Sequence, residues 1–81
     1  MTDPSAGEQE VFKTFDDLVA AYEKRIFNVI YRILGDYEEA ADLTQETFIS
    51  AFKGFERFRG DSKIYTWLYQ IAINQIGRAH V

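Results

Sequence analysis

Apolar residues recur every three or four positions in three stretches of this sequence, a spacing that predicts amphipathic helices. The first stretch follows Thr14, a residue suited to cap a helix, and it ends at Gly35, where a left-handed backbone is expected. Its apolar positions form two stripes, which predicts that this helix is covered on two sides. The first stripe holds Phe15, Leu18, Tyr22, Ile26, Val29 and Ile33, and the second holds Phe27, Tyr31 and Leu34.

The second predicted helix opens at Asp36, with Glu39 placed to complete a capping box. At about 100° per residue, its two faces differ in polarity. The inner face holds Ala40, Thr44, Thr47, Phe48, Ala51, Phe55 and Phe58. The outer face holds Glu38, Asp42, Gln45, Glu46, Ile49 and Lys53. An isoleucine ringed by acids and an amide is typical of a small protein-docking site, although a single exposed apolar residue is also ordinary.

The third predicted helix runs from about Lys63 to a break at Gly77. Its core positions are Ile64, Leu68, Ile71, Ala72 and Ile76. The opposite face holds Thr66, Trp67, Gln70, Ile73, Asn74, Gly77 and Arg78. Along that face a ring, two amides and a cation form a ladder made of Trp67, Gln70, Asn74 and Arg78. Such groups can pair with base edges or phosphates, and the alternative is a solvated face with one partly packed tryptophan.

Length and composition restrict the fold to one small domain. With 81 residues, 47% of them hydrophobic, the chain can form a single core, and the predicted fold is all-α, a compact three-helix bundle. The absence of cysteine leaves no disulfide and no thiolate metal site, which favours a reducing cytoplasm. No apolar run reaches membrane-spanning length. Residues 1–13 are predicted to be a disordered acidic tail, and residues 14–81 the helical domain.

Charge is distributed unevenly along the chain. Residues 1–52 carry eleven acidic and four basic side chains, a balance of -7, whereas residues 53–81 carry two acidic and five basic ones, a balance of +3. The sum is the formal net charge of -4. This polarity favours a basic protein partner at one end and phosphates at the other, although helix surfaces also vary in charge by chance.

The loop before the third helix joins cations to aromatic rings. Arg59, Gly60, Asp61, Ser62 and Lys63 follow two phenylalanines and precede two tyrosines and a tryptophan. Cations beside rings suit unpaired nucleic acid, because the cations meet phosphates while the rings stack on bases. Part of this loop can instead serve only as a helix cap, through an aspartate or serine side chain.

Two motifs in this chain resemble those of sigma factors. The string DLTQETF, from Asp42 to Phe48, resembles the DLxQExF motif, and FRGDS with YTWLY and IA, from Phe58 to Ala72, resembles the FRGDS…TWLYxIA signature. In this order they resemble region 2 of the sigma-70 family, most closely its extracytoplasmic-function (ECF) group. The resemblance extends over roughly residues 15–78.

The resemblance implies two binding surfaces and no cofactor. The surface that would bind the clamp helices of the RNA polymerase beta-prime subunit comprises Asp42, Gln45, Glu46, Phe48 and Ile49, with Phe48 supporting it from the inner face. The residues that would open the promoter minus-ten element, hold a flipped non-template base and contact the upstream part are Arg59, Gly60, Asp61, Ser62, Lys63, Tyr65, Thr66, Trp67, Gln70, Asn74 and Arg78. The implied partners are RNA polymerase core, single-stranded promoter DNA and an anti-sigma factor.

The chain departs from the family pattern in two places. The family has a basic residue at the position of Gln70, and a more basic end to its third helix than residues 77–81. Gln70 is therefore expected to change promoter preference or weaken a phosphate contact. The second DNA-binding domain of the family, region 4, is absent, so we expect the sequence to be part of a longer protein.

Two other classes of function compete with this interpretation. For an enzyme, the chain offers one histidine, His80, no cysteine, and serines at 50 and 62 without a base for a triad. Glu38, Asp42 and Glu46 imitate a carboxylate metal site but lack an accompanying Glu-x-x-His, so we predict no enzymatic activity and no metal. The other alternative is a helical protein-interaction module, bound by an anti-sigma factor and without independent DNA binding.

Overall fold

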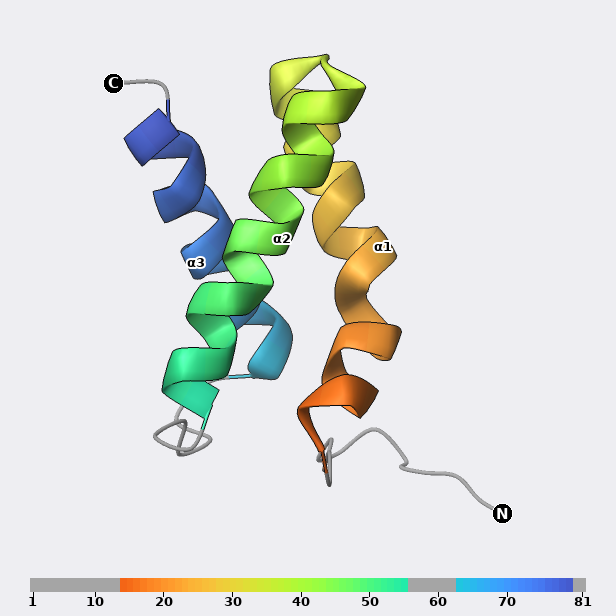
Figure 1. Ribbon diagram of the computed structural model, residues 1–81, viewed down its shortest axis with the longest axis vertical. Coiled ribbons are helices and arrows are strands. Elements are labelled where there is room, and N and C mark those ends of the chain that lie inside the picture. Colours follow the sequence, from red (N-terminus) through yellow and green to blue (C-terminus); the bar gives the residue numbers. More distant parts are fainter. Residues whose placement is uncertain (1–13, 56–62, 80–81) are drawn as a thin grey trace.

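Three helices pack against one another in the computed structural model of the chain, which describes residues 14–55 and 63–79. They are α1 (Phe15–Leu34), α2 (Tyr37–Gly54) and α3 (Ile64–Ala79), and each runs antiparallel to the one before it (Figure 1). The predicted all-α three-helix bundle is confirmed. The predicted tail over 1–13, Phe58 and the loop residues 59–62 lie outside the described residues. In the part of the chain that the structure describes, no helix is long and apolar enough to cross a membrane.

The helix ends follow the capping residues that the sequence supplies. The Thr14 hydroxyl accepts a hydrogen bond from the Asp17 amide at 3.2 Å, and the Asp36 carboxylate accepts one from the Glu39 amide at 2.9 Å. Gly35 adopts a φ of 74°, and its amide donates to the Tyr31 carbonyl at 2.7 Å. Only a residue without a Cβ adopts that backbone at little cost, so α1 ends where the glycine stands.

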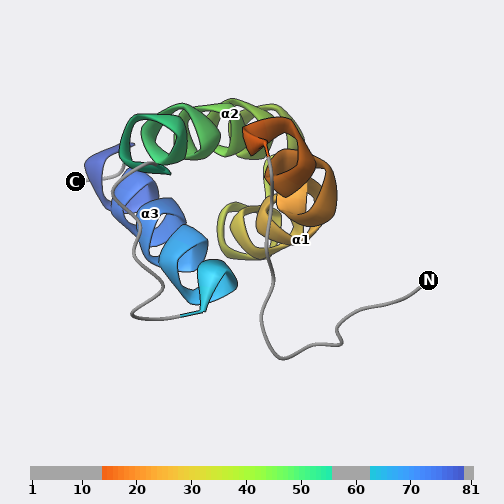
Figure 2. The ribbon, with the colours of Figure 1, turned by 90° about the horizontal axis from the view of Figure 1, so that it is seen from below.

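The core is formed by all three helices, which lie around it as the sides of a triangle (Figure 2). Its buried apolar side chains are Leu18, Tyr22, Ile26, Ile30, Ala40, Leu43, Phe48, Ala51, Ile64, Leu68 and Ala72. Two buried threonines of α2 are satisfied within their own helix, because Thr44 donates to the Ala40 carbonyl at 2.7 Å and Thr47 to the Leu43 carbonyl at 2.8 Å. The interior of α2 therefore holds hydroxyls without the cost of an unpaired donor.

Some predicted core positions are wrong in detail. The buried row of α1 advances by four residues each time and includes Ile30, whereas Ile33, predicted to be in the core, is 52% exposed. Tyr31 of the second stripe is 42% exposed. Leu43, assigned from the sequence only to a motif, is 8% exposed and belongs to the core. Periodicity gives the direction of a side chain, while its burial also depends on which neighbouring helix lies above it.

The predicted break at Gly77 is also wrong, since α3 continues to Ala79. Gly35 is the only glycine with positive φ among the described residues, so Gly77 does not have the left-handed backbone that ends a helix. A glycine inside a helix costs only about 1 kcal/mol relative to alanine. The preceding Ile76 packs against the core, and this packing holds the last turn in place.

The two glycines at helix ends are expected to respond in opposite directions to alanine. A Cβ atom built on Gly54 lies 3.5 Å from Cζ2 of Trp67, an ordinary contact distance, so Gly54→Ala should raise the free energy of unfolding by about 0.5–1 kcal/mol. Gly35→Ala should lower it by about 1–2 kcal/mol, because alanine is strained at the φ of 74°. Urea denaturation measures both variants, and a loss of stability in Gly54→Ala would contradict the packing described.

Candidate functional site

The outer face of α2 contains the five polar residues and the isoleucine that were predicted to lie there. All of them are exposed: Glu38, Asp42, Gln45, Glu46, Ile49 and Lys53. Ile49 is 49% exposed among them. Phe48 points the other way and is only 7% exposed, as its place on the inner face predicted. The DLTQETF motif thus has exposed residues on one face of α2 and buried residues on the other. The exposed ones are Asp42, Gln45 and Glu46, and the buried ones are Leu43, Thr44, Thr47 and Phe48.

A cluster of phenylalanines fixes α2 against the start of α1. The ring of Phe15 lies edge-on to those of Phe48, Phe52 and Phe55, with centroid distances of 6.4, 5.2 and 5.4 Å. Edge-to-face contacts are favourable arrangements for aromatic pairs and add to the apolar burial. Phe48 and Phe55 make these contacts from less exposed positions of α2 and Phe52 from a position that is 63% exposed, so the contacts fix the half of α2 that carries Ile49 against α1.

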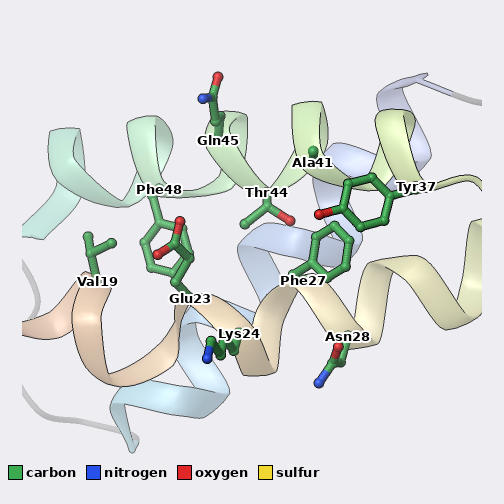
Figure 3. A pocket seen from close by; sticks show the side chains of 10 residues that line it. All are labelled: Val19, Glu23, Lys24, Phe27, Asn28, Tyr37, Ala41, Thr44, Gln45 and Phe48. Carbon is green, nitrogen blue, oxygen red and sulfur yellow. The ribbon is translucent and has the colours of Figure 1, made fainter.

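A groove between α1 and α2 lies beside this face (Figure 3). Its volume is about 660 Å³, and it is lined by Val19, Glu23, Lys24, Phe27, Asn28, Tyr37, Ala41, Thr44, Gln45 and Phe48. Figure 3 shows Gln45 pointing away from the centre of the groove, toward the outer side of α2. The groove could not be predicted from the sequence, because it exists only where the flanks of two helices meet.

A buried side-chain hydrogen bond joins α2 to α3. Gln75 is 8% exposed, and its Nε2 donates to the Ser50 hydroxyl at 2.9 Å. These residues neighbour Ile49 on α2 and Asn74 on α3, so the bond ties the two candidate surfaces together. This bond was not predicted from the sequence, although an amide among the core positions of α3 is a signal that the amide has a partner.

This hydrogen bond is expected to contribute measurably to stability. Ser50→Ala removes the acceptor and leaves the Gln75 amide less well satisfied, which should cost about 1–3 kcal/mol of unfolding free energy. Gln75→Leu in the Ser50→Ala background should cost less than in the wild type, because no polar group is then stranded. A double-mutant cycle by urea denaturation measures the coupling free energy between Ser50 and Gln75, expected to be about 0.5–1.5 kcal/mol. Strictly additive effects of the two substitutions would contradict a stabilising hydrogen bond between them.

The ladder of α3 lies on the flank that turns toward α2. Trp67 is half-buried and packs near Gly54. Beyond it, Gln70, Asn74 and Arg78 are all exposed. Lys63 and Thr66 are exposed at the start of the helix, and α3 contains no acidic residue. This flank therefore presents the Trp67 ring, one edge of which lies near Gly54, followed by two exposed amides and an exposed cation.

Tyr65 lies on the opposite flank of α3, facing α1. Its ring centroid is 5.8 Å from that of Tyr22 and 6.2 Å from that of Tyr69. The Arg25 guanidinium lies over it, 4.1 Å from the centroid. Two residues along a helix correspond to a rotation of about 200°, so Tyr65 and Trp67 are on different sides of α3. The structure therefore does not unite the predicted DNA-binding residues on one edge.

The structure describes only some of the predicted binding residues. The described ones form an α2 surface and two flanks of α3, whereas Arg59, Gly60, Asp61 and Ser62 lie outside the described residues. Within residues 14–55 and 63–79, no group of three or more His, Cys, Asp or Glu side chains could hold a metal ion. The three carboxylates that imitate a metal site in the sequence do not form such a group.

Known proteins resemble this chain over most of its length. The family described as Sigma-70 region 2 matches residues 18–80. The chain belongs to this sigma-70 family. The match confirms the family suggested by the two motifs, and the arrangement of α1, α2 and α3 is consistent with the helical fold of its region 2.

Relatives with curated names support the same assignment. The RNA polymerase sigma-H factor of Pseudomonas aeruginosa is 50% identical over 62 residues, covering 76% of this chain and 32% of that protein. The ECF RNA polymerase sigma factor SigW of Bacillus subtilis is 41% identical over 68 residues, covering 84% and 35%. The ECF RNA polymerase sigma-E factor of Escherichia coli is 40% identical over 62 residues, covering 76% and 32%. This sigma region 2 chain thus spans about a third of the length of these relatives.

Proposed function

We propose that this sigma region 2 domain acts in transcription initiation in the bacterial cytoplasm, as a binding module and not as an enzyme. It docks on RNA polymerase core through the outer face of α2 and captures unpaired promoter DNA at the start of α3. The names of its relatives, which are RNA polymerase sigma factors, support the general role. One observation supports two separate binding surfaces: the exposed face for protein lies on α2, whereas the ring-and-amide ladder for DNA lies on α3.

The α2 surface has the composition of a protein-docking site. Ile49 supplies an exposed apolar centre, and Asp42 and Glu46 supply a charged rim one helical turn apart. A partner helix with apolar and basic side chains complements this surface, since opposite charges steer association and fix its register. The clamp helices of the beta-prime subunit are the partner that the family resemblance suggests.

Capture of unpaired DNA follows from the energy of base stacking. Extracting a base from the duplex costs a few kcal/mol, and stacking it on an aromatic ring returns about 1–3 kcal/mol. Trp67 is held in place by packing near Gly54, so no further ordering of the ring is needed when a base arrives. Exposed amides of Gln70 and Asn74 can pair with base edges. These contacts suffice to trap an opened base but not to melt a long duplex.

The acidic character of the domain fits this mechanism. A net charge of -4 disfavours binding to duplex DNA, because such binding depends on neutralising phosphates with cations. Polymerase would then supply the remaining affinity and bring the α3 surface to the promoter. The domain is therefore expected to bind DNA usefully only in the single-stranded form or as part of a complex.

Fluorescence anisotropy with labelled single strands tests the DNA part of this proposal. At low salt, a single strand carrying a genuine minus-ten element should bind more tightly than a scrambled strand, and both more tightly than duplex. The groove between α1 and α2 favours a second candidate function, a protein-interaction module held by an anti-sigma factor. If no strand binds even at low salt, this second function replaces DNA capture.

A further inference from the structure

We propose a second contact for single-stranded nucleic acid on the flank of α3 that faces α1, separate from the Trp67 ladder. In this contact Arg25 of α1 binds a backbone phosphate, and the ring of Tyr69 stacks on a base. The proposal extends the proposed function, since it assumes that the domain captures unpaired DNA. It adds a residue from α1 to a surface that the sequence motifs confine to α3 and the loop before it.

Arg25 is held in place by aromatic rings. Its guanidinium carbon lies 4.1 Å from the Tyr65 centroid and 5.6 Å from the Tyr22 centroid, while the residue as a whole is exposed. A contact with a ring engages the charge of a guanidinium and does not consume its N–H donors. Arg25 is thus positioned in advance and keeps the donors that bind phosphate oxygens in pairs.

The surroundings of Arg25 on this flank favour an anionic ligand. The helix facing it, α3, contains no carboxylate from Ile64 to Ala79. On α1 the nearest acid in sequence, Glu23, lines the groove on the other side, toward α2. Lys24 lines the same groove, so the adjacent residues Lys24 and Arg25 lie on different sides of α1, one toward α2 and the other toward α3.

Tyr69 provides the stacking surface, as the next ring along from Tyr65, which Arg25 covers. It is 38% exposed, and its ring centroid is 6.2 Å from that of Tyr65 and one helical turn further along α3. The two rings are tilted by 39°, so they form a stepped row that ends in the exposed ring. A cation fixed over one ring of this row and an exposed ring at its end can bind phosphates and bases of single strands without strong sequence preference.

The salt dependence of binding tests the role of Arg25. The probe is a labelled single-stranded DNA of about twelve nucleotides with mixed sequence, titrated with the whole chain at several salt concentrations. Arg25→Ala should reduce the slope of log K against log salt by about 0.7, which corresponds to roughly five- to tenfold weaker binding at about 50 mM salt. Arg25→Lys should keep the slope. A purely structural role of Arg25 would lower the melting temperature and leave the slope unchanged.

The matched control is Lys24→Ala, which removes the same charge from the neighbouring position on the groove side. It should change the slope by much less than Arg25→Ala. Equal changes in the two variants would show that only net charge matters and would overturn the assignment of Arg25. If the wild-type chain binds no single strand at low salt, the proposed DNA capture and this inference both fail.

Tyr69 is tested by a pair of variants that separate ring from size. Tyr69→Phe should bind the same probe as the wild type does, whereas Tyr69→Leu should bind roughly five- to 150-fold more weakly through loss of stacking. Thermal melting checks that both variants remain folded at the temperature of the titration. Wild-type affinity in Tyr69→Leu would overturn the stacking role while leaving the Trp67 ladder untouched.

Discussion

Glu46→Arg is expected to abolish binding of the domain to RNA polymerase core and to leave its affinity for single-stranded DNA unchanged. Glu46 is exposed, one turn from Asp42 and three residues from Ile49, so the new cation would stand at the rim of the proposed docking surface. A like charge placed against a basic partner costs several kcal/mol, which corresponds to a loss of affinity of about 100-fold or more. Biolayer interferometry with immobilised core polymerase measures this loss.

The control for this variant is Glu23→Arg, an identical charge reversal at an exposed residue of α1 that lines the groove and lies outside the outer face of α2. It should weaken binding to core polymerase far less, and both variants should melt at the wild-type temperature because both side chains are exposed. If Glu23→Arg weakens binding as much as Glu46→Arg does, the effect is a general electrostatic one. That result would contradict the proposal that the outer face of α2 is the docking surface.

Trp67→Ala is expected to have the converse effect, weakening single-stranded DNA binding and sparing the interaction with core polymerase. Loss of one stacking ring should cost about 1–3 kcal/mol of binding free energy. Because Trp67 is half-buried and packs against the core cluster, this variant should also be less stable. Anisotropy titrations must therefore be made well below its melting temperature.

Two milder substitutions separate stacking by Trp67 from packing. Trp67→Phe keeps an aromatic face and should retain most of the DNA affinity, whereas Trp67→Leu keeps apolar volume without a ring and should lose it. Core polymerase binding should be close to that of the wild type in both. DNA affinity that follows the melting temperature of the variants, and not the presence of a ring, would contradict the stacking role.

The helices themselves could be predicted because their determinants are local. Thr14, Gly35 and Asp36 cap the helices at the predicted positions, and a cap depends on atoms within three or four residues. The exposed face of α2 was also predictable, since rotation by about 100° per residue fixes which side chains share a face. These features needed no knowledge of how the helices pack.

Features that depend on the packing of helices were not predictable in the same way. Ile33 has the spacing of a core residue yet is 52% exposed, while Gln75 is polar yet buried through its bond to Ser50. The rotation of about 200° between Tyr65 and Trp67 follows from their spacing, but the neighbour that each ring meets, α1 or α2, is set by the bundle. The resemblance to sigma region 2 named these residues but did not divide them between two flanks.

This division has a mechanistic consequence for the proposed function. A strand that contacts both flanks of α3 would cross the solvent side of the helix, where Thr66 and Gln70 are exposed and no side chain is acidic. The α2 face lies on a different helix, so a bound protein and a bound strand need not compete. The hydrogen bond between Ser50 and Gln75 keeps the two surfaces in a fixed relation.

Chemical-shift mapping of the nitrogen-15-labelled chain tests most directly whether two ligands use two surfaces. A peptide of the beta-prime clamp helices and a single-stranded minus-ten oligonucleotide are titrated separately. The account predicts that the peptide shifts the amides around Asp42, Glu46 and Ile49, and that the oligonucleotide shifts those around Thr66, Gln70 and Asn74. Perturbation of the same amides by both ligands would contradict it.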